Sequence, residues 1–144
     1  ITPNLQGRSA TDKDILHRSL LLIDIDRAGA TKSPATDEDI EAARSLSKEI
    51  AAHLTKLGWP EPIQVMSGNG WHLYYKLDQL SNDDETTGLI QRVLKQLAKR
   101  FNNSEVNIDT VVYNASRITK VPGTVMRKGE ETEGRPFRTA VVYE

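Results

Sequence analysis

Cysteine is absent from the 144-residue sequence, and its three histidines stand far apart in the chain. These absences exclude disulfide scaffolds, and they exclude zinc modules built from cysteine and clustered histidine. No apolar run approaches the roughly 18 residues of a membrane span, and the N-terminal residues lack the pattern of a signal peptide. We therefore expect no zinc, no membrane partner and a cytoplasmic location.

A charge excess of either sign is also absent, because 19 Lys and Arg residues accompany 20 Asp and Glu residues. The chain alone is thus expected to bind nucleic acid only weakly through bulk charge. Its length suffices for one hydrophobic core without disulfides or metals, which predicts a single domain over residues 1–144. The chain begins with Ile and ends within a strand-like stretch, 139–143, so we expect a fragment of a longer multidomain protein.

The first half of the chain predicts a strand, a helix and a hairpin. Apolar residues lead into an alternating tail over 20–26, which is typical of a buried strand that reaches a polar edge. After a loop, an acidic start and apolar residues at spacings of three and four predict a helix from Thr36 to Leu57. Two short runs that favour strands, 63–67 and 71–77, flank Gly-Asn-Gly, which is typical of a hairpin turn.

The second half predicts one more helix and two strands. A polar, acidic start at 81–85 precedes apolar residues at helical spacing up to Phe101. The runs 106–112 and 139–143 favour strands, and the stretch between them is irregular. The order of elements indicates an α+β fold, in which both long helices pack on one face of an antiparallel sheet. The other face is then free for a ligand.

The first predicted strand ends in Asp24-Ile25-Asp26. Because side chains alternate along a strand, both carboxylates lie on one face, opposite Ile23 and Ile25. Two carboxylates side by side suit Mg²⁺ or Mn²⁺, and a pair of such ions can activate an attacking oxygen and stabilise a leaving phosphate. Asp109 would complete the metal cage if its strand is a neighbour of the first. Solvated acids at strand ends are the alternative interpretation.

The turn Ser67-Gly68-Asn69-Gly70 and the following His72 have two compatible interpretations. One is an ordinary hairpin turn. In the other, backbone N–H groups of the turn and the Ser67 hydroxyl hold phosphate oxygens, and His72 donates a hydrogen bond to the same anion. Strand alternation places His72 and Tyr74 on one face, with Trp71 and Tyr75 on the opposite face.

Four basic residues and no acid occupy 117–128, a composition that is typical of anion binding. Arg117 and Lys120 begin this run and could contact phosphate oxygens that metal ions do not reach. A solvated surface loop is the alternative interpretation. Arg135 and Arg138 extend the basic character and could contact a nucleic-acid backbone.

These motifs, in this order, resemble the catalytic core of archaeo-eukaryotic primases, and in particular the primase-polymerases of phages, plasmids and other mobile elements. The resemblance covers about Leu20 to Lys128. It rests on Leu-Leu-Ile-Asp-Ile-Asp, on Ser-Gly-Asn-Gly-Trp-His-Leu-Tyr-Tyr, and on Asn-Ile-Asp followed by Asn-Ala-Ser-Arg-Ile-Thr-Lys-Val-Pro-Gly-Thr. It implies an α+β core with an RNA-recognition-like antiparallel sheet and two long helices.

The resemblance also implies a function, that of a template-directed nucleotidyltransferase that joins nucleoside triphosphates in DNA replication. The protein would act in a prokaryotic cell and could be encoded by a phage or a plasmid. Asp24, Asp26 and Asp109 would be the catalytic ligands of two Mg²⁺ or Mn²⁺ ions. The implied nucleotide-binding residues are Ser67, Gly68, Asn69, Gly70, His72, Arg117 and Lys120. The implied partners are a single-stranded DNA template, its primer, and a helicase or helical primase domain in the full-length protein.

Two other functions fit the same motifs. A non-catalytic module that binds single-stranded nucleic acid would stack bases on Trp71, Tyr74 or Tyr75, although three nearby acids would repel that ligand. A metal-dependent nuclease could use the same ions with water as the nucleophile. Dependence on nucleoside triphosphates and release of pyrophosphate would separate the polymerase from the nuclease.

Overall fold

The computed structural model describes residues 9–29 and 32–143. A short 3₁₀ helix (Asp12–Asp14) precedes the elements of the main sheet and its helices. These elements are, in chain order, β1 (His17–Arg27), α1 (Asp37–Lys56), β2 (Ile63–Met66), β3 (Gly70–Ser81), α2 (Asp84–Phe101), β4 (Val106–Ile108), β5 (Val125–Met126), β6 (Arg138–Thr139) and β7 (Val141–Tyr143).

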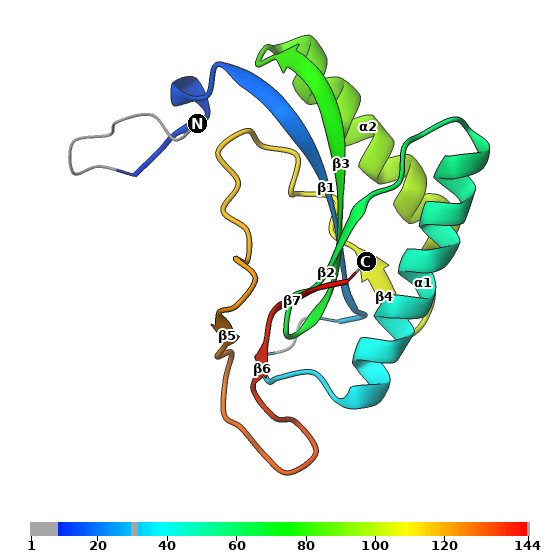
Figure 1. Cartoon of the computed structure of the whole chain (residues 1–144), viewed down its shortest axis with the longest axis vertical. Helices are drawn as coiled ribbons and strands as arrows, with labels where there is room; N and C mark the ends of the chain where they lie inside the picture. The colour runs from blue at the N-terminus through cyan, green and yellow to red at the C-terminus, as the bar shows by residue number, and fades with distance from the viewer. Residues whose placement is uncertain (1–8, 30–31, 144) are drawn as a thin grey trace.

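The main sheet has the strand order β4-β1-β3-β2-β7, and each neighbouring pair is antiparallel. Its first four strands and two helices follow one another as βαββαβ with the strand order 4-1-3-2, which is the RNA-recognition-like topology. Strands β5 and β6 form a separate two-stranded ribbon. Figure 1 shows α1 and α2 on one side of the sheet, which confirms the predicted α+β architecture.

The core lies between the sheet and the two helices. Strand β1 alternates along its length, with Leu21, Ile23 and Ile25 buried against the helices. Ile50 of α1 and Leu94 of α2 are fully buried in the same cluster. Burial of each such side chain contributes roughly 1.5–3 kcal/mol to folding. One face of β1 is thereby committed to the core, and its other face is left for polar side chains.

Side-chain caps fix where the helices begin. Thr36 Oγ1 accepts a hydrogen bond from Asp39 N at 3.1 Å, and Asp39 Oδ2 accepts one from Thr36 N at 2.9 Å. This reciprocal capping box was predicted from the spacing of the two residues, and it starts α1. Asp83 caps α2 by accepting from Thr86 N. Gly58, at a φ of 86°, follows the end of α1 as expected.

Several predicted strand boundaries were wrong. Strand β1 begins at His17 instead of residue 20. Strand β3 continues to Ser81 instead of residue 77. Strand β4 ends at Ile108 instead of residue 112, because Asp109 Oδ1 accepts from Val111 N at 2.8 Å and turns the chain. The run 139–143 is divided between β6 and β7, which belong to different sheets.

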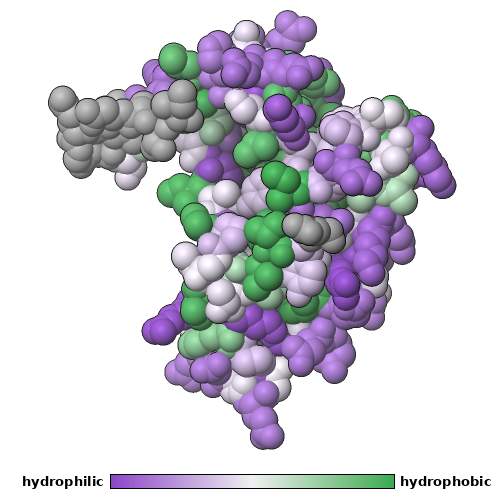
Figure 2. Space-filling view, in the orientation of Figure 1, coloured by the Kyte–Doolittle hydropathy of each residue, from purple (hydrophilic) through white to green (hydrophobic). Residues whose placement is uncertain are grey.

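The outer surface is largely polar over the helices. Figure 2 shows hydrophilic residues along the helical side of the molecule and hydrophobic residues gathered near the middle of the face in view. Within residues 9–29 and 32–143, no helix is long and apolar enough to cross a bilayer.

Candidate active site

The open face of the sheet carries the two acids of β1. Asp24 lies directly opposite His72 on β3, and Asp26 lies opposite Gly70. Because Ile23 and Ile25 are fully buried on the other face, both carboxylates point away from the core, as the alternation predicted. Gly70 is required by this arrangement, since a Cβ at its position would collide with the Asp26 carboxylate and the Ile25 carbonyl.

Asp109 reaches the same place from the neighbouring strand. β4 pairs antiparallel with β1, with Ile108 opposite Ile25. The backbone N–H of Asp109 then donates to the carbonyl of Asp24 at 2.9 Å. Asp109 therefore follows directly after the strand that pairs with β1, next to the backbone of Asp24.

A cavity of about 360 Å³ brings together nearly all of the predicted site residues. Those that line it are Asp24, Asp26, Asp109, Ser67, Asn69, His72, Arg117 and Lys120. Gly68 and Gly70 stand in the turn beside the cavity and do not line it. The cavity also contains Lys128, Thr119 and Met126, which the sequence analysis did not select. Lys128 belongs to the basic run that the sequence does show, so composition alone could have included it.

The electrostatics of this cavity are unfavourable for free carboxylates. Burial, followed by the adjacent Asp24, raises the pKa of Asp26 to about 6, while Lys128 and His72 act in the opposite direction. Asp24 Oδ1 is buried 3.2 Å from His72 Nε2 but receives no hydrogen bond from any described residue. A buried anionic oxygen without a donor is costly, and a bound cation would remove that cost.

The donor set fits a hard divalent cation. Carboxylate oxygens of Asp24 and Asp26 face one cavity and are the ligands that Mg²⁺ and Mn²⁺ prefer. Asp109 uses one oxygen to accept from Val111 N, so its second oxygen is the one that could bind a metal. Across the described residues, no three His, Asp or Glu side chains are already gathered into a metal cage.

The turn at the cavity edge is held by its own hydrogen bonds. Ser67 N donates to Gly70 O and Gly70 N donates to Ser67 Oγ, each at 3.0 Å. Gly68 N contacts Met66 Sδ. Asn69 N also donates to Ser67 Oγ at 3.5 Å, so all four backbone N–H groups of the turn, which were expected to hold phosphate, are engaged within the protein. The Ser67 hydroxyl hydrogen is the donor that this turn can direct at an anion.

Asn69 and Gly68 join the turn to distant segments. The Asn69 side chain is buried, and its Oδ1 accepts from Ala35 N at 2.7 Å, just before α1. A Cβ on Gly68 would lie 2.6 Å from Met126 Cβ and 2.8 Å from the Arg138 carbonyl. The close approach of the β5–β6 ribbon to the turn, together with a φ of 93°, explains why this position is glycine.

His72 is held between the Tyr74 hydroxyl and Asp24. Its Nδ1 lies 3.0 Å from the Tyr74 hydroxyl, which in turn lies 2.6 Å from Thr119 Oγ1. His72 faces the cavity, which is the side of the strand that the alternation predicted. Its side chain is buried, with the residue only 6% exposed. When the Tyr74 hydroxyl donates to Nδ1, the His72 proton resides on Nε2, the nitrogen nearer the acids.

Basic residues of the segment after Asp109 close the opposite wall. Lys120 Nζ donates to the Val125 carbonyl and Arg117 Nη2 donates to the Val111 carbonyl, both at 2.7 Å. These bonds orient the two side chains beside the cavity without neutralising their charge. Acids on one wall and cations on the other are suited to a metal-bound polyphosphate.

Arg135 and Arg138 are engaged in contacts within the protein. Arg138 Nη2 pairs with Asp37 Oδ1 at 2.6 Å, and Arg135 Nη1 lies 3.4 Å from Asp39 Oδ2. Both guanidinium groups also donate to carbonyls of the loop before α1. Their role is to fasten the β5–β6 ribbon to the acidic start of α1, and the sequence offered no signal for these long-range pairs.

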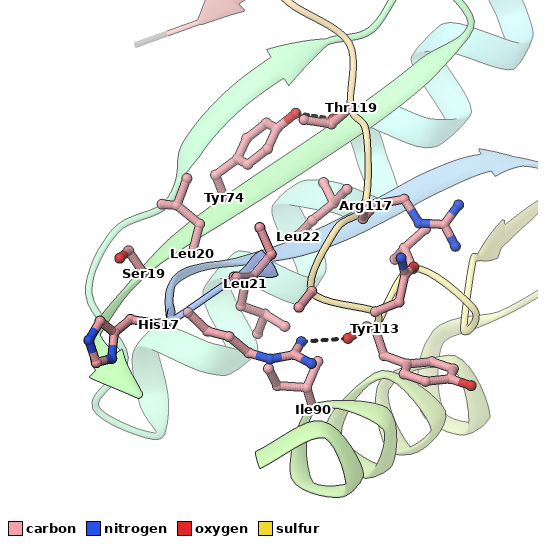
Figure 3. Close-up of a pocket in the computed structure, with 15 residues that line it drawn as sticks. His17, Ser19, Leu20, Leu21, Leu22, Tyr74, Ile90, Tyr113, Arg117 and Thr119 are labelled. Carbon is pink, nitrogen blue, oxygen red and sulfur yellow. Dashed lines mark hydrogen bonds between the residues drawn. The ribbon is translucent and has the colours of Figure 1, made fainter. Parts of the chain in front are cut away.

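A second cavity, of about 290 Å³, adjoins the first (Figure 3). The two share Leu22, Val112, Arg117 and Thr119. The close-up shows the Tyr74 hydroxyl bonded to Thr119 at its edge and an apolar floor from β1. The second cavity has a mixed lining, in which Arg18, Asn114 and Arg117 accompany the leucines of β1.

Comparison with solved structures finds a chain that shares this fold. The chain superposes on the polymerase domain of Mycobacterium tuberculosis Ligase D, solved in complex with DNA, with a TM-score of 0.53 and 21% sequence identity. The match covers 84% of this chain and 44% of the Ligase D chain, so the protein spans less than half the length of that structure. No protein-family model and no curated protein matches the sequence. The likeness shows a shared fold.

Proposed function

We propose that the chain is a template-directed nucleotidyltransferase of the primase-polymerase type, which joins nucleoside triphosphates on a single-stranded DNA template. One observation carries the proposal: three acids from adjacent strands and a buried histidine face basic residues across a single cavity. The fold shared with a DNA-bound polymerase domain supports the same conclusion.

Two Mg²⁺ or Mn²⁺ ions held by Asp24, Asp26 and Asp109 would supply activation of a 3′-hydroxyl and stabilisation of the departing pyrophosphate. The chain's own residues position the triphosphate. Lys120 and Arg117 attract its oxygens from the basic wall, and the Ser67 hydroxyl donates from the turn. His72 directs its Nε2 proton toward the cavity.

Each acid has a separate task in this scheme. Asp24 and Asp26 bring paired negative charge to the cavity, where burial and then repulsion from Asp24 raise the pKa of Asp26, and a bound cation would favour its ionised form. Asp109 adds charge from the neighbouring strand. No protein nucleophile is needed, because the primer hydroxyl attacks the α-phosphate directly.

Extension of a labelled primer on a single-stranded template tests the proposal. Ribonucleotides and deoxyribonucleotides are supplied separately with Mg²⁺ or Mn²⁺. Asp24→Asn should abolish extension, whereas Asp78→Asn, on the exposed part of β3 and outside the cavity, should not. Metal-dependent nucleotide binding measured by calorimetry provides a second readout. Absence of both extension and nucleotide binding in the wild-type chain would overturn the proposal.

Neither alternative function is favoured by the geometry. Trp71 and Tyr75 are 2% and 1% exposed and belong to the core, so they cannot stack bases on the open face. Of these three aromatic residues, Tyr74 lies on the same side of the sheet as the cavity. Its hydroxyl is already hydrogen-bonded to Thr119. Cleavage of DNA without nucleoside triphosphates, and without release of pyrophosphate, would instead identify a nuclease.

A further inference from the structure

A groove of about 630 Å³ lies on the helical side of the molecule, away from the acids. It is bounded by the C-terminal half of α1 and by α2 from Arg92 to Arg100. Its apolar surface comes from Leu57, which is 63% exposed, and from the half-buried Trp59 and Val93. None of the cavity residues described above contributes to it.

The rim of this groove carries positive charges that no acidic residue of its lining balances. Arg92, Lys99 and Arg100 line it, and no aspartate or glutamate does. Among the described residues, no carboxylate forms an ion pair with any of the three. In a chain of net charge −1, three positive charges on one apolar groove are a local feature that a carboxylate-bearing ligand would complement.

The shape of the groove favours a helix as its occupant. The groove is lined by residues of both helices, and the side chains of a third helix can interdigitate into such a groove. The stretch from Arg92 to Arg100 is roughly 12 Å long, a little over two helical turns. Such a length accommodates apolar anchors at positions i, i+3, i+4 and i+7 of a partner.

Nucleic acid fits the groove less well than a peptide does. Its exposed apolar surface is mainly aliphatic, whereas single strands stack on open aromatic faces. The Trp59 ring is half-buried and packs at 89° against Tyr75, with the ring centres 5.2 Å apart. The guanidinium group of Arg100 lies over the Phe101 ring, so its positive charge is held at the surface of α2.

We infer that this groove docks an acidic amphipathic helix of a partner protein or domain. The apolar stripe of that helix packs on Leu57, Trp59 and Val93, and its flanking carboxylates pair with Arg92, Lys99 and Arg100. The inference stands independently of nucleotidyl transfer, since the groove and the acidic cavity share no residue.

A fluorescence anisotropy titration tests the inference with a defined probe. The probe is a labelled peptide of about 16 residues with Leu at one helical face and Glu on both flanks. A second peptide of identical composition has its Leu residues scattered around the helix. The wild-type chain should bind the first peptide at least about tenfold more tightly than the second. Equal binding would show bulk charge attraction only and would overturn the inference.

Matched variants locate the binding. Lys99→Glu should weaken binding of the amphipathic peptide about tenfold, and Leu57→Ser by a similar factor. Lys76→Glu reverses the same charge on an exposed residue of β3 and should leave binding unchanged. Primer extension and a thermal melt on the same samples show whether each variant is folded.

Two further outcomes would also overturn the inference. One is a lack of measurable peptide binding by the wild-type chain at millimolar concentration. The other is a single-stranded oligonucleotide that binds while the peptide does not, with Lys99→Glu reducing that binding, which would assign the groove to nucleic acid.

Discussion

His72 Nε2 lies 3.2 Å from Asp24 Oδ1, directly across the β1–β3 pair, and His72 Nδ1 lies 3.0 Å from the Tyr74 hydroxyl. One histidine thus connects the acidic centre of the cavity with a hydrogen-bonded pair at its edge. The register of two strands, rather than a flexible loop, sets these contacts.

Tyr74→Phe should leave the His72 ring in place but less firmly oriented. The variant deletes the hydroxyl that fixes the Nδ1 side of the ring, so Tyr74 is expected to act as a positioning residue. We expect the KM for nucleoside triphosphate to rise about tenfold with little change in kcat, measured by steady-state primer extension. Tyr143→Phe, on β7, is the control and should leave both constants unchanged. Unchanged KM in Tyr74→Phe would show that the hydroxyl serves packing only.

Asp26→Asn should stabilise the metal-free protein while abolishing extension. The folded-state pKa of about 6 exceeds the ordinary 3.8, so ionisation of Asp26 opposes folding. The contribution of protonated Asp26 to the stability of the fold is therefore fully present below pH 3.8, and it is lost as the pH rises through about 6. At pH 7.5 the variant should unfold with a free energy about 2 kcal/mol higher than wild type, and the difference should vanish near pH 4.

Urea unfolding at both pH values measures this effect. Addition of Mg²⁺ or Mn²⁺ at pH 7.5 should raise the stability of the wild type more than that of Asp26→Asn, since the variant has lost a ligand. A variant less stable than wild type at pH 7.5 without metal would contradict the assigned repulsion.

Gly68→Ala should disturb the ribbon next to the cavity. The new Cβ would meet the Arg138 carbonyl and Met126, and the φ of 93° is unfavourable for alanine. A loss of roughly 2 kcal/mol in unfolding free energy is expected, with weaker nucleotide binding. Gly134→Ala is the matched control, because nothing lies within 4 Å of its added Cβ. Equal thermal melts of the two variants would refute this account.

Lys128→Ala should weaken triphosphate binding. Lys128 lines the cavity and is close enough to Asp26 to lower the pKa of that carboxyl. We expect a rise of about tenfold in nucleotide Kd by calorimetry in the presence of metal. Arg127→Ala removes the neighbouring charge, which does not line the cavity, and should change the Kd less than twofold. Similar losses in both variants would point to general charge attraction.

Much of the fold could be predicted because its signals are local. The period-two pattern of β1 separates Ile23 from Asp24, and the spacing of Thr36 and Asp39 marks the start of α1. The predicted sides of the strands for His72 and Trp71 are also correct. Periodicity and capping act over a few residues, so one sequence suffices to show them.

Features that depend on contacts between distant residues were not predictable. The pairing of Arg138 with Asp37 joins residues far apart in the chain, and no local pattern distinguishes it from a DNA contact. The end of β4 depends on how the Asp109 side chain bonds its own backbone. The basic run shows Lys128 as a candidate, but which of its residues reach the cavity depends on where the ribbon lies, which Gly68 permits. Tertiary packing decides each of these.

The two walls of the cavity come from different parts of the chain, and this has a consequence for synthesis. Residues 24 to 109 contribute the acids, whereas residues 117 to 128 contribute the cations, and the ribbon that supports them is fastened to α1 only through Arg135 and Arg138. A nascent chain thus acquires its cation-attracting half before its anion-attracting half. Under the proposed function, the growing protein has its metal-binding acids, Ser67 and His72 before it has the cations that attract a triphosphate.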